Sequence, residues 1–219
     1  MKKYLVSLFF ILLVVTFGAA RGQESDVALV TLLSGDVTYI PRSGIPGRVS
    51  PFIKIRDGDR INIAAGGQVR IAYFEGSRQE LWSGPATFRA RKATAELISG
   101  KAPDISNLPA GVTQHMARIP EIIKFAKLGG MQVRGISKHE KKTSIDQKAT
   151  LDQARAAYAT MRQEMPADDI APELYLYAAL YEFREYDEMK AVVAEMQRKQ
   201  PDNQDAKALD AWLTSRMSR

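Results

Sequence analysis

Cysteine is missing from all 219 positions of the chain. Disulfides, thiolate chemistry and zinc sites built on cysteine are therefore excluded. A lipoprotein also needs a cysteine at its cleavage site, so anchoring to lipid by that route is excluded as well. The fold has to be stabilised by its hydrophobic cores alone, and about 200 residues are enough for one large domain or two small ones.

Histidine is nearly as scarce, and the common catalytic motifs are missing. His115 and His139 lie on unrelated polar segments without a second ligand at helical or turn spacing, so we expect surface residues. Residues 57–59 (Asp-Gly-Asp) begin like a calcium-binding loop, but Ile61 occupies the fifth position and Gln68 the twelfth, which favours a β-turn. No phosphate loop, GxSxG or HExxH occurs. We therefore predict no enzyme, no cofactor and no metal, although two carboxylates that meet in space would carry no motif.

Only one apolar run is long. Residues 4–17 are interrupted by just two polar residues, two lysines precede them, and small residues follow at 18–20. This order is typical of a secretory signal peptide, which we predict over residues 1–22 with cleavage after Ala20 or Gly22. The run is shorter than the roughly 20 residues of a spanning helix, and an uncleaved N-terminal anchor is the alternative. We expect the rest of the chain in the periplasm, with no membrane insertion after cleavage.

Net charge is small and scattered. The formal value of +6 falls by two when Lys2 and Lys3 leave with the signal, and by three if Arg21 leaves too. The densest basic cluster covers residues 138–142, where a solvated linker is a better explanation than a nucleic-acid footprint. We therefore predict no nucleic-acid partner.

The N-terminal half, residues 27–97, has apolar positions with a period of two. Short runs rich in β-branched and aromatic residues lie at 27–33, 37–39, 53–55, 61–63 and 69–73. Turn signals that contain glycine separate these runs. The pattern predicts an all-β sandwich or barrel-like domain.

The order of the turns resembles the FecR-type periplasmic β domain over about 70 residues. The elements that carry the resemblance are Gly35-Asp36-Val37, Gly58-Asp59-Arg60-Ile61, Gly66-Gly67-Gln68-Val69-Arg70-Ile71 and Phe74-Glu75-Gly76-Ser77, with Leu81 and Phe88 at the next apolar positions. Glu75 stands where the family usually has Asp. The transmembrane FecR regulators carry a cytoplasmic anti-sigma segment before their membrane helix. This chain starts with its predicted signal instead, so the iron-sensing role does not carry over.

A polar connection is predicted after the strands, over residues 99–114. Pro120 suits the start of a short apolar helix that runs to Leu128, and residues 131–134 suit a last strand that closes the β domain. A charged segment without apolar period follows, either a linker or a loose first helix. The predicted divisions are a FecR-like β domain at 23–135, a linker at 136–150 and a helical module at 151–219.

The helical module has an apolar period of 3.6, and its sequence repeats after 35 residues. The matched pairs are Ala154 with Met189, Tyr158 with Val193, Met161 with Met196, and Pro166 with Pro201. These positions resemble the second helix of a tetratricopeptide repeat, and those at Leu174, Tyr177, Ala178 and Tyr181 resemble its first helix. The resemblance implies α-helical hairpin repeats, with residues 205–217 as a capping helix. The methionines replace smaller residues, so we expect looser packing.

The fold class expected from both halves is a two-domain α+β protein. We predict an exported, non-enzymatic adaptor or scaffold that binds another cell-envelope protein through its helical module, with the β domain as a second contact. Tyr175 and Phe183 are the expected contact residues, and packing inside the helical hairpin is the alternative. Trp82 is expected either in the core or as a surface anchor. The competing function is a glycan- or peptidoglycan-binding module in which Trp82 stacks on a sugar.

Overall fold

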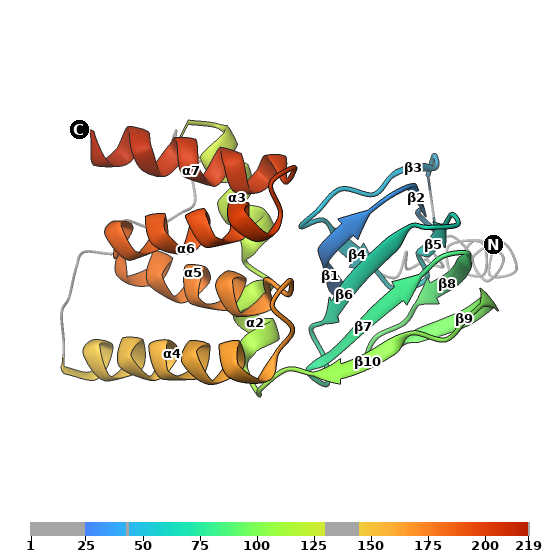
Figure 1. The fold of residues 1–219 in the computed structure, drawn as a ribbon, viewed down its shortest axis with the longest axis horizontal. Coiled ribbons are helices and arrows are strands. Elements are labelled where there is room, and N and C mark those ends of the chain that lie inside the picture. The colour runs from blue at the N-terminus through green and yellow to red at the C-terminus, as the bar shows by residue number, and fades with distance from the viewer. Residues whose placement is uncertain (1–24, 43, 130–144, 219) are drawn as a thin grey trace, which may run out of the picture.

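A computed structural model shows an N-terminal β sandwich followed by a layer of helices (Figure 1). It describes residues 25–42, 44–129 and 145–218. The predicted signal peptide, most of the predicted linker and the strand expected at 131–134 lie outside the described residues. Within the described part, no helix is both long and apolar enough to cross a membrane.

Two antiparallel five-stranded sheets form the sandwich. Sheet A has the order β10-β7-β6-β1-β4, and sheet B has the order β3-β2-β5-β8-β9. The strands are β1 Asp26–Ser34, β2 Val37–Ile40, β3 Gly47–Arg48, β4 Lys54–Arg56, β5 Arg60–Ile63, β6 Gln68–Tyr73, β7 Arg78–Ser83, β8 Ala86–Ala90, β9 Ala95–Gly100 and β10 Asp104–Asn107. The predicted runs of period two all coincide with strands. The predicted polar connection at 99–114 is wrong in part, because β10 lies inside it and pairs with β7.

The turn at residues 57–59 places the carboxylate of Asp59 in the protein interior. Asp59 is fully buried, and it accepts hydrogen bonds from the Tyr39 hydroxyl at 2.7 Å and from the backbone N–H groups of Arg42 at 3.0 Å and Arg56 at 2.8 Å. Gly58 has a φ of 91°, which a residue with a Cβ rarely adopts. Asp59 therefore fixes the loop after β2 to the turn after β4.

Six helices follow the strands in the described part of the chain. They are α2 Val112–Met116, α3 Ile119–Lys127, α4 Ile145–Glu164, α5 Ala171–Phe183, α6 Tyr186–Lys199 and α7 Gln204–Met217. The short helix predicted from Pro120 corresponds to α3, and the predicted terminal helix corresponds to α7. Helix α4 begins at Ile145, inside the segment expected to be a linker or a loose first helix.

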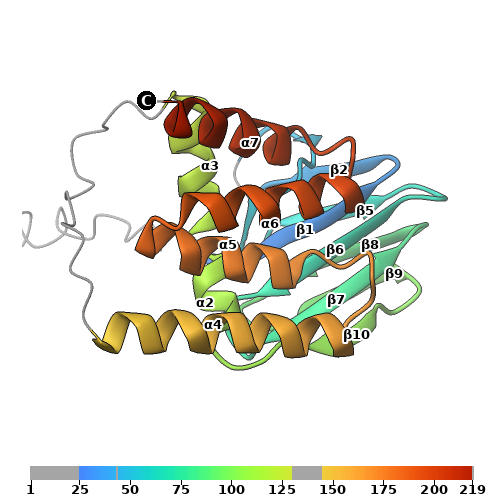
Figure 2. The same ribbon diagram turned by 60° about the vertical axis from the view of Figure 1, so that its left-hand side comes forward.

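Sheet A lies in the middle of three layers, because sheet B covers one of its faces and the helices cover the other (Figures 1 and 2). The sandwich core includes Val69 and Ile71 of β6, whereas Ala72 of β6 and Leu29 of β1 belong to a core shared with all six helices. Helix α2 packs against α5, and helix α3 packs against α7. The chain is thus α+β, and its sandwich and helices share one apolar interface.

Candidate functional site

Trp82 lies in the sandwich core, not on the surface. Its side chain is 1% exposed, and its ring stacks on Phe88 with centroids 4.3 Å apart. The indole N–H donates a 2.9 Å hydrogen bond to Glu80, whose carboxylate also binds Arg78 at 2.6 Å. Trp82 is therefore a core residue, and the expectation that it anchors a ligand at the surface is wrong. Its ring has no exposed face on which a sugar could stack.

Tyr175 and Phe183 are both half-buried against the shared core. The Tyr175 ring meets the edge of His115 from α2, with centroids 5.2 Å apart. On the same side of the layer, Phe125 of α3 meets Trp212 of α7 at 5.8 Å. Of the two residues expected to contact a partner, Tyr175 is therefore covered in part by α2 of the same chain, and Phe183 stays half-buried.

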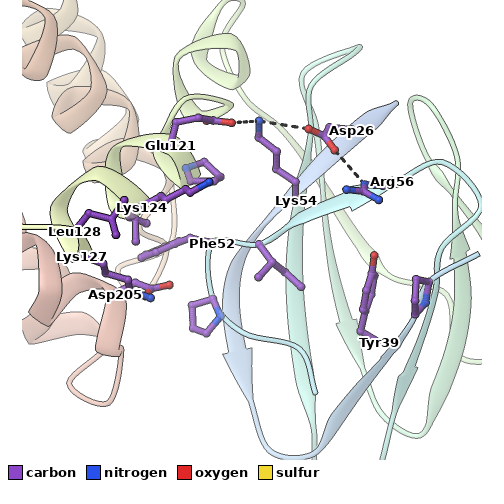
Figure 3. A pocket seen from close by; sticks show the side chains of 15 residues that line it. Asp26, Tyr39, Phe52, Lys54, Arg56, Glu121, Lys124, Lys127, Leu128 and Asp205 are labelled. Carbon is purple, nitrogen blue, oxygen red and sulfur yellow. Dashed lines mark hydrogen bonds and ion pairs between the residues drawn. The ribbon is translucent and has the colours of Figure 1, made fainter. Parts of the chain in front are cut away.

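An open groove of about 740 Å³ lies between the sandwich and the helical layer (Figure 3). The sandwich contributes β1, β2, β4 and the turn before β4, and the helical layer contributes α3 and the start of α7. The apolar lining consists of Tyr39, Pro41, Pro51, Phe52, Ile53, Pro120, Ile123 and Leu128. Leu128 is 42% exposed although it is a large apolar residue. The groove is thus an accessible apolar surface at the boundary between two layers.

Phe52 lies at the centre of the groove and has an unusual backbone conformation (Figure 3). Its φ is 60°, in the left-handed region that non-glycine residues rarely occupy. Its N–H donates a 2.9 Å hydrogen bond to the carbonyl of Val30, which holds the strained residue against β1. The ring is 2% exposed and joins the shared core. Strained residues of this kind often occur at binding sites, and this one fixes the floor of the groove.

Ion pairs connect the two walls of the groove (Figure 3). Lys54 of β4 contacts Glu121 of α3 at 2.5 Å and Asp26 of β1 at 3.3 Å, and Asp26 also contacts Arg56 at 3.6 Å. Partial burial by itself lowers the pKa of Lys54, but the hydrogen bond to Glu121 and the two carboxylate charges outweigh it and raise the pKa. Lys54 therefore stays protonated and holds β4 next to α3.

The helical wall carries further charge. Lys127 forms an ion pair with Asp205 at the start of α7. Lys124 is exposed, and among the described residues it has no ion pair. Lys124 is therefore a cation available to a ligand in the groove.

The chemistry of the groove favours binding. Its three carboxylates, Asp26, Glu121 and Asp205, all take part in ion pairs. The lining has no serine, threonine or cysteine, and its one hydroxyl, that of Tyr39, donates a hydrogen bond to the buried Asp59. Across the described ranges, no three acidic or histidine residues are grouped so that they could hold a metal ion. An apolar floor with charged groups at the rim is the usual composition of a recognition surface.

Local sequence patterns do not reveal this groove as a whole. Glu121, Lys124 and Lys127 recur every three residues, which places them on one side of α3, and that signal was available. The opposite wall was not predictable, because β4 is brought to α3 by contacts between distant parts of the chain.

Comparisons with known proteins found no match for the chain. No family model matches it, no curated protein matches it, and no solved structure matches it. The resemblances to the FecR-type domain and to tetratricopeptide repeats therefore rest on the residues quoted for them.

Proposed function

We propose that this chain is an exported, non-enzymatic adaptor that binds an extended segment of another envelope protein in the groove between its two layers. The predicted signal peptide takes it to the periplasm. The sandwich acts as a FecR-like β domain and the helices as a short tetratricopeptide-like module. Support for the repeats comes from burial, since Ala154, Met161, Met189, Val193 and Met196 at the repeat positions all lie in the interior.

The groove is the single observation that carries the proposal. Its apolar lining can cover the side chains of an extended segment, and Lys124 can pair with an acidic residue of that segment. Because the sandwich supplies one wall and the helices supply the other, both parts contact the ligand. This arrangement differs from the initial prediction, in which the helical module carried the main contact.

Glycan binding is the weaker alternative. It depended on an exposed Trp82, and that ring is stacked inside the core. In the groove, Tyr39 is the one aromatic residue that is not fully buried, and its hydroxyl is bound to Asp59. Binding to purified cell wall remains a measurable outcome of the experiment below.

A cross-linking experiment tests the groove in the envelope. A photoreactive amino acid is placed at Leu128 in the groove and, as a control, at Lys148, which is exposed on α4 and does not line the groove. We expect a discrete cross-linked envelope protein from position 128 and none from position 148. Equal products from both positions, or none from position 128, would contradict the proposal.

The affinity for the identified partner is then measured with purified proteins. Lys124→Glu should weaken binding by about fivefold or more, because a rim charge that pairs with the ligand is reversed. Lys148→Glu changes the net charge equally and should leave the affinity unchanged. If both variants bind like the wild type while purified cell wall retains the protein, the glycan alternative is correct.

A further inference from the structure

Sheet B forms the outer layer of the sandwich, and one of its faces is exposed (Figures 1 and 2). In β5, Ile61 and Ile63 belong to the sandwich core. Because successive side chains of a strand point to opposite faces, Arg60 and Asn62 point away from that core. No helix or strand of the described ranges covers this outer face. It is therefore a surface on which a ligand can lie.

The strand register arranges the outward side chains of sheet B in two rows. The first row crosses all five strands and is polar throughout; it consists of Arg48, Thr38, Asn62, Thr87 and Ser99. The second row consists of Ile40, Arg60, Arg89 and Glu96. Neighbouring strands lie about 4.8 Å apart, so the first row is about 19 Å long. The two rows together make up the sheet-B face.

The sheet-B face carries an excess of positive charge. The strands of sheet B contain three arginines and one acidic residue, Glu96. Glu96 already contacts Arg91 at 2.6 Å and Arg89 at 3.5 Å, so its charge is compensated within the β8–β9 hairpin. Arg60 lies directly opposite Arg89, and like charges at opposite positions destabilise a sheet. An anion bound between these two arginines would remove the repulsion.

Several arginines of this region also lack partners within the chain. Arg42, Arg48 and Arg60 are exposed, and their side chains have no ion pair, hydrogen bond or ring contact among the described residues. Arg70 of sheet A, in contrast, is held by two carboxylates. A free guanidinium group can bind a carboxylate through two parallel hydrogen bonds. The three exposed side chains are therefore available to an external carboxylate.

The polar row favours a sugar over other anionic partners. The hydroxyls of Thr38 and Ser99 have no hydrogen-bond partner in the described part of the chain. Thr87 donates a 2.9 Å hydrogen bond to Asn62 Oδ1, which leaves the amide N–H groups of Asn62 free. Sugar hydroxyls both donate and accept hydrogen bonds, so they suit such a row. A protein interface usually has an apolar or aromatic centre, whereas the one apolar side chain of the sheet-B face, Ile40, is half-buried.

We propose that the sheet-B face binds a linear polysaccharide that carries carboxylate groups. The carboxylates pair with Arg48 and Arg60, and the sugar hydroxyls form hydrogen bonds with the first row. One sugar unit of such a polymer is about as long as the distance between neighbouring strands, so successive sugars meet successive strands. The sheet-B face shares no residue with the groove. The polysaccharide therefore fixes the location of the chain, and the groove still accepts its protein partner.

Binding of defined polymers to the purified mature chain tests the chemistry of the ligand. The probes are polygalacturonate oligosaccharides, the same oligosaccharides with methyl-esterified carboxyl groups, and polyglutamate of similar length, compared by isothermal titration calorimetry. We expect polygalacturonate to bind at least about tenfold more tightly than either of the others, because it alone combines carboxylates with sugar hydroxyls. No binding of polygalacturonate, or equal affinity for the methyl ester or for polyglutamate, would overturn the proposal.

A sedimentation assay with phosphatidylglycerol vesicles tests the competing occupant, an anionic bilayer. Ile45 just before β3 and Ile98 in β9 are exposed at the two edges of sheet B, and apolar residues beside cations also suit a membrane surface. We expect the chain to stay in the supernatant at physiological salt. Cosedimentation that Arg60→Glu abolishes would assign the sheet-B face to a membrane and refute the polysaccharide.

Charge reversal then locates the binding site. Arg48→Glu and Arg60→Glu should each weaken polygalacturonate binding by about fivefold or more, because a cation that pairs with the ligand is reversed. Arg60→Glu also places a carboxylate opposite Arg89, so it should not destabilise the sheet, which thermal unfolding checks.

Two variants outside the sheet-B face are the controls. Lys148→Glu changes the net charge by the same amount on α4 and should leave the affinity for polygalacturonate unchanged. Lys124→Glu in the groove should also leave it unchanged, so a failure of the groove and a failure of the sheet-B face are distinguishable. If Lys148→Glu weakens binding as much as Arg60→Glu, the interaction depends on net charge alone and the site is wrong.

Discussion

The two faces of sheet A bury different kinds of side chains. The face toward sheet B is almost entirely apolar, and its one buried carboxylate, Glu80, receives hydrogen bonds from Trp82, Arg78, Thr94 and Ala95. The face toward the helices mixes apolar residues such as Leu29 and Ala72 with the buried cation Arg70. A sheet that is covered on both faces loses the alternation of apolar and polar residues that marks a half-exposed sheet. The run of buried residues in β6 shows this directly.

Polar contacts position the helices on the second face. Arg70 Nη2 lies 3.3 Å from Asp168 Oδ2, and Arg70 Nη1 lies 3.8 Å from Asp169 Oδ2 in the turn between α4 and α5. The turn after α6 makes a similar contact, because the Gln200 side chain donates a 3.0 Å hydrogen bond to the carbonyl of Thr31 in β1. Apolar burial supplies most of the stabilisation at such an interface, and the directional contacts fix its geometry.

The strongest test of the comparison removes a large side chain from each face. Trp82→Ala should lower the free energy of unfolding by about 3–5 kcal/mol, and Ile119→Ala should lower it by about 2–5 kcal/mol, because both side chains are buried. If the two faces belong to one cooperative structure, each substitution shifts a single transition. Urea unfolding of the wild-type chain, followed by helical circular dichroism and by tryptophan fluorescence, which reports Trp82 in the sandwich as well as Trp212 in α7, should then give coincident curves.

Two separate transitions would support the independent folding units that the sequence predicts. In that case Trp82→Ala would affect the sandwich transition and leave the helical signal unchanged. Ile105→Ala serves as the control, because its side chain is largely exposed and its loss should cost less than about 0.5 kcal/mol.

A smaller effect is expected from the ionic contact on the helical face. Arg70→Met keeps the apolar volume but should lower the free energy of unfolding by about 3 kcal/mol, because it leaves the carboxylate of Asp169 buried without its cation. Chemical unfolding at neutral pH measures this change. The double variant Arg70→Met with Asp169→Asn should recover part of the loss, since an asparagine can still accept the hydrogen bond that Asp169 receives from the N–H of Ala171.

The neighbouring Asp168 provides the matched control. Its side chain is 59% exposed, so Asp168→Asn should change the free energy of unfolding by less than about 1 kcal/mol. If Arg70→Met has an equally small effect, the ion pairs of Arg70 contribute little to holding the helices on sheet A.

Local sequence patterns predicted the elements better than their assembly. The period of two located β1, β2, β4, β5 and β6 because each has apolar residues at alternate positions between turn residues, and the period of 3.6 located α5, α6 and α7. Strand β3 lies at the end of a predicted turn, and Leu81 of β7 and Phe88 of β8 were expected in strands only from the resemblance. Strand β10 was missed because all four of its residues are exposed, so it has no apolar face to detect. Tyr175 was expected at a partner surface because nothing local shows that His115 of α2 packs against its ring.

The candidate site depends on contacts that no local pattern contains. Lys54 and Glu121 are 67 residues apart in the chain, and their pairing follows from the docking of α3 on sheet A. Trp82 is a second case in which the local sequence does not determine where a side chain lies. Its position after a turn suits the core and the surface equally, and only the partners Glu80 and Phe88 decide between them.

The smallest predicted effect concerns alkaline pH and the outer part of the helical layer. Burial, followed by the negative charge of Glu173, raises the pKa of Tyr158 from 10.0 to about 12, and its hydroxyl donates a 3.2 Å hydrogen bond to Glu173. The folded state thus keeps a proton that the unfolded chain loses near pH 10. The stabilisation is complete below that pH and is lost as the pH rises to about 12.

Tyr158→Phe removes both this titration and one hydrogen bond. At neutral pH we expect a loss of about 1 kcal/mol in the free energy of unfolding. Between pH 10 and 12 the stability of the variant should fall less steeply than that of the wild type. Urea unfolding across this range measures the difference, and because the other buried tyrosines titrate in both proteins, their contribution cancels. Parallel stability curves for the two proteins would show that the Tyr158 hydroxyl titrates as it does in the unfolded chain, and that its contact with Glu173 contributes nothing.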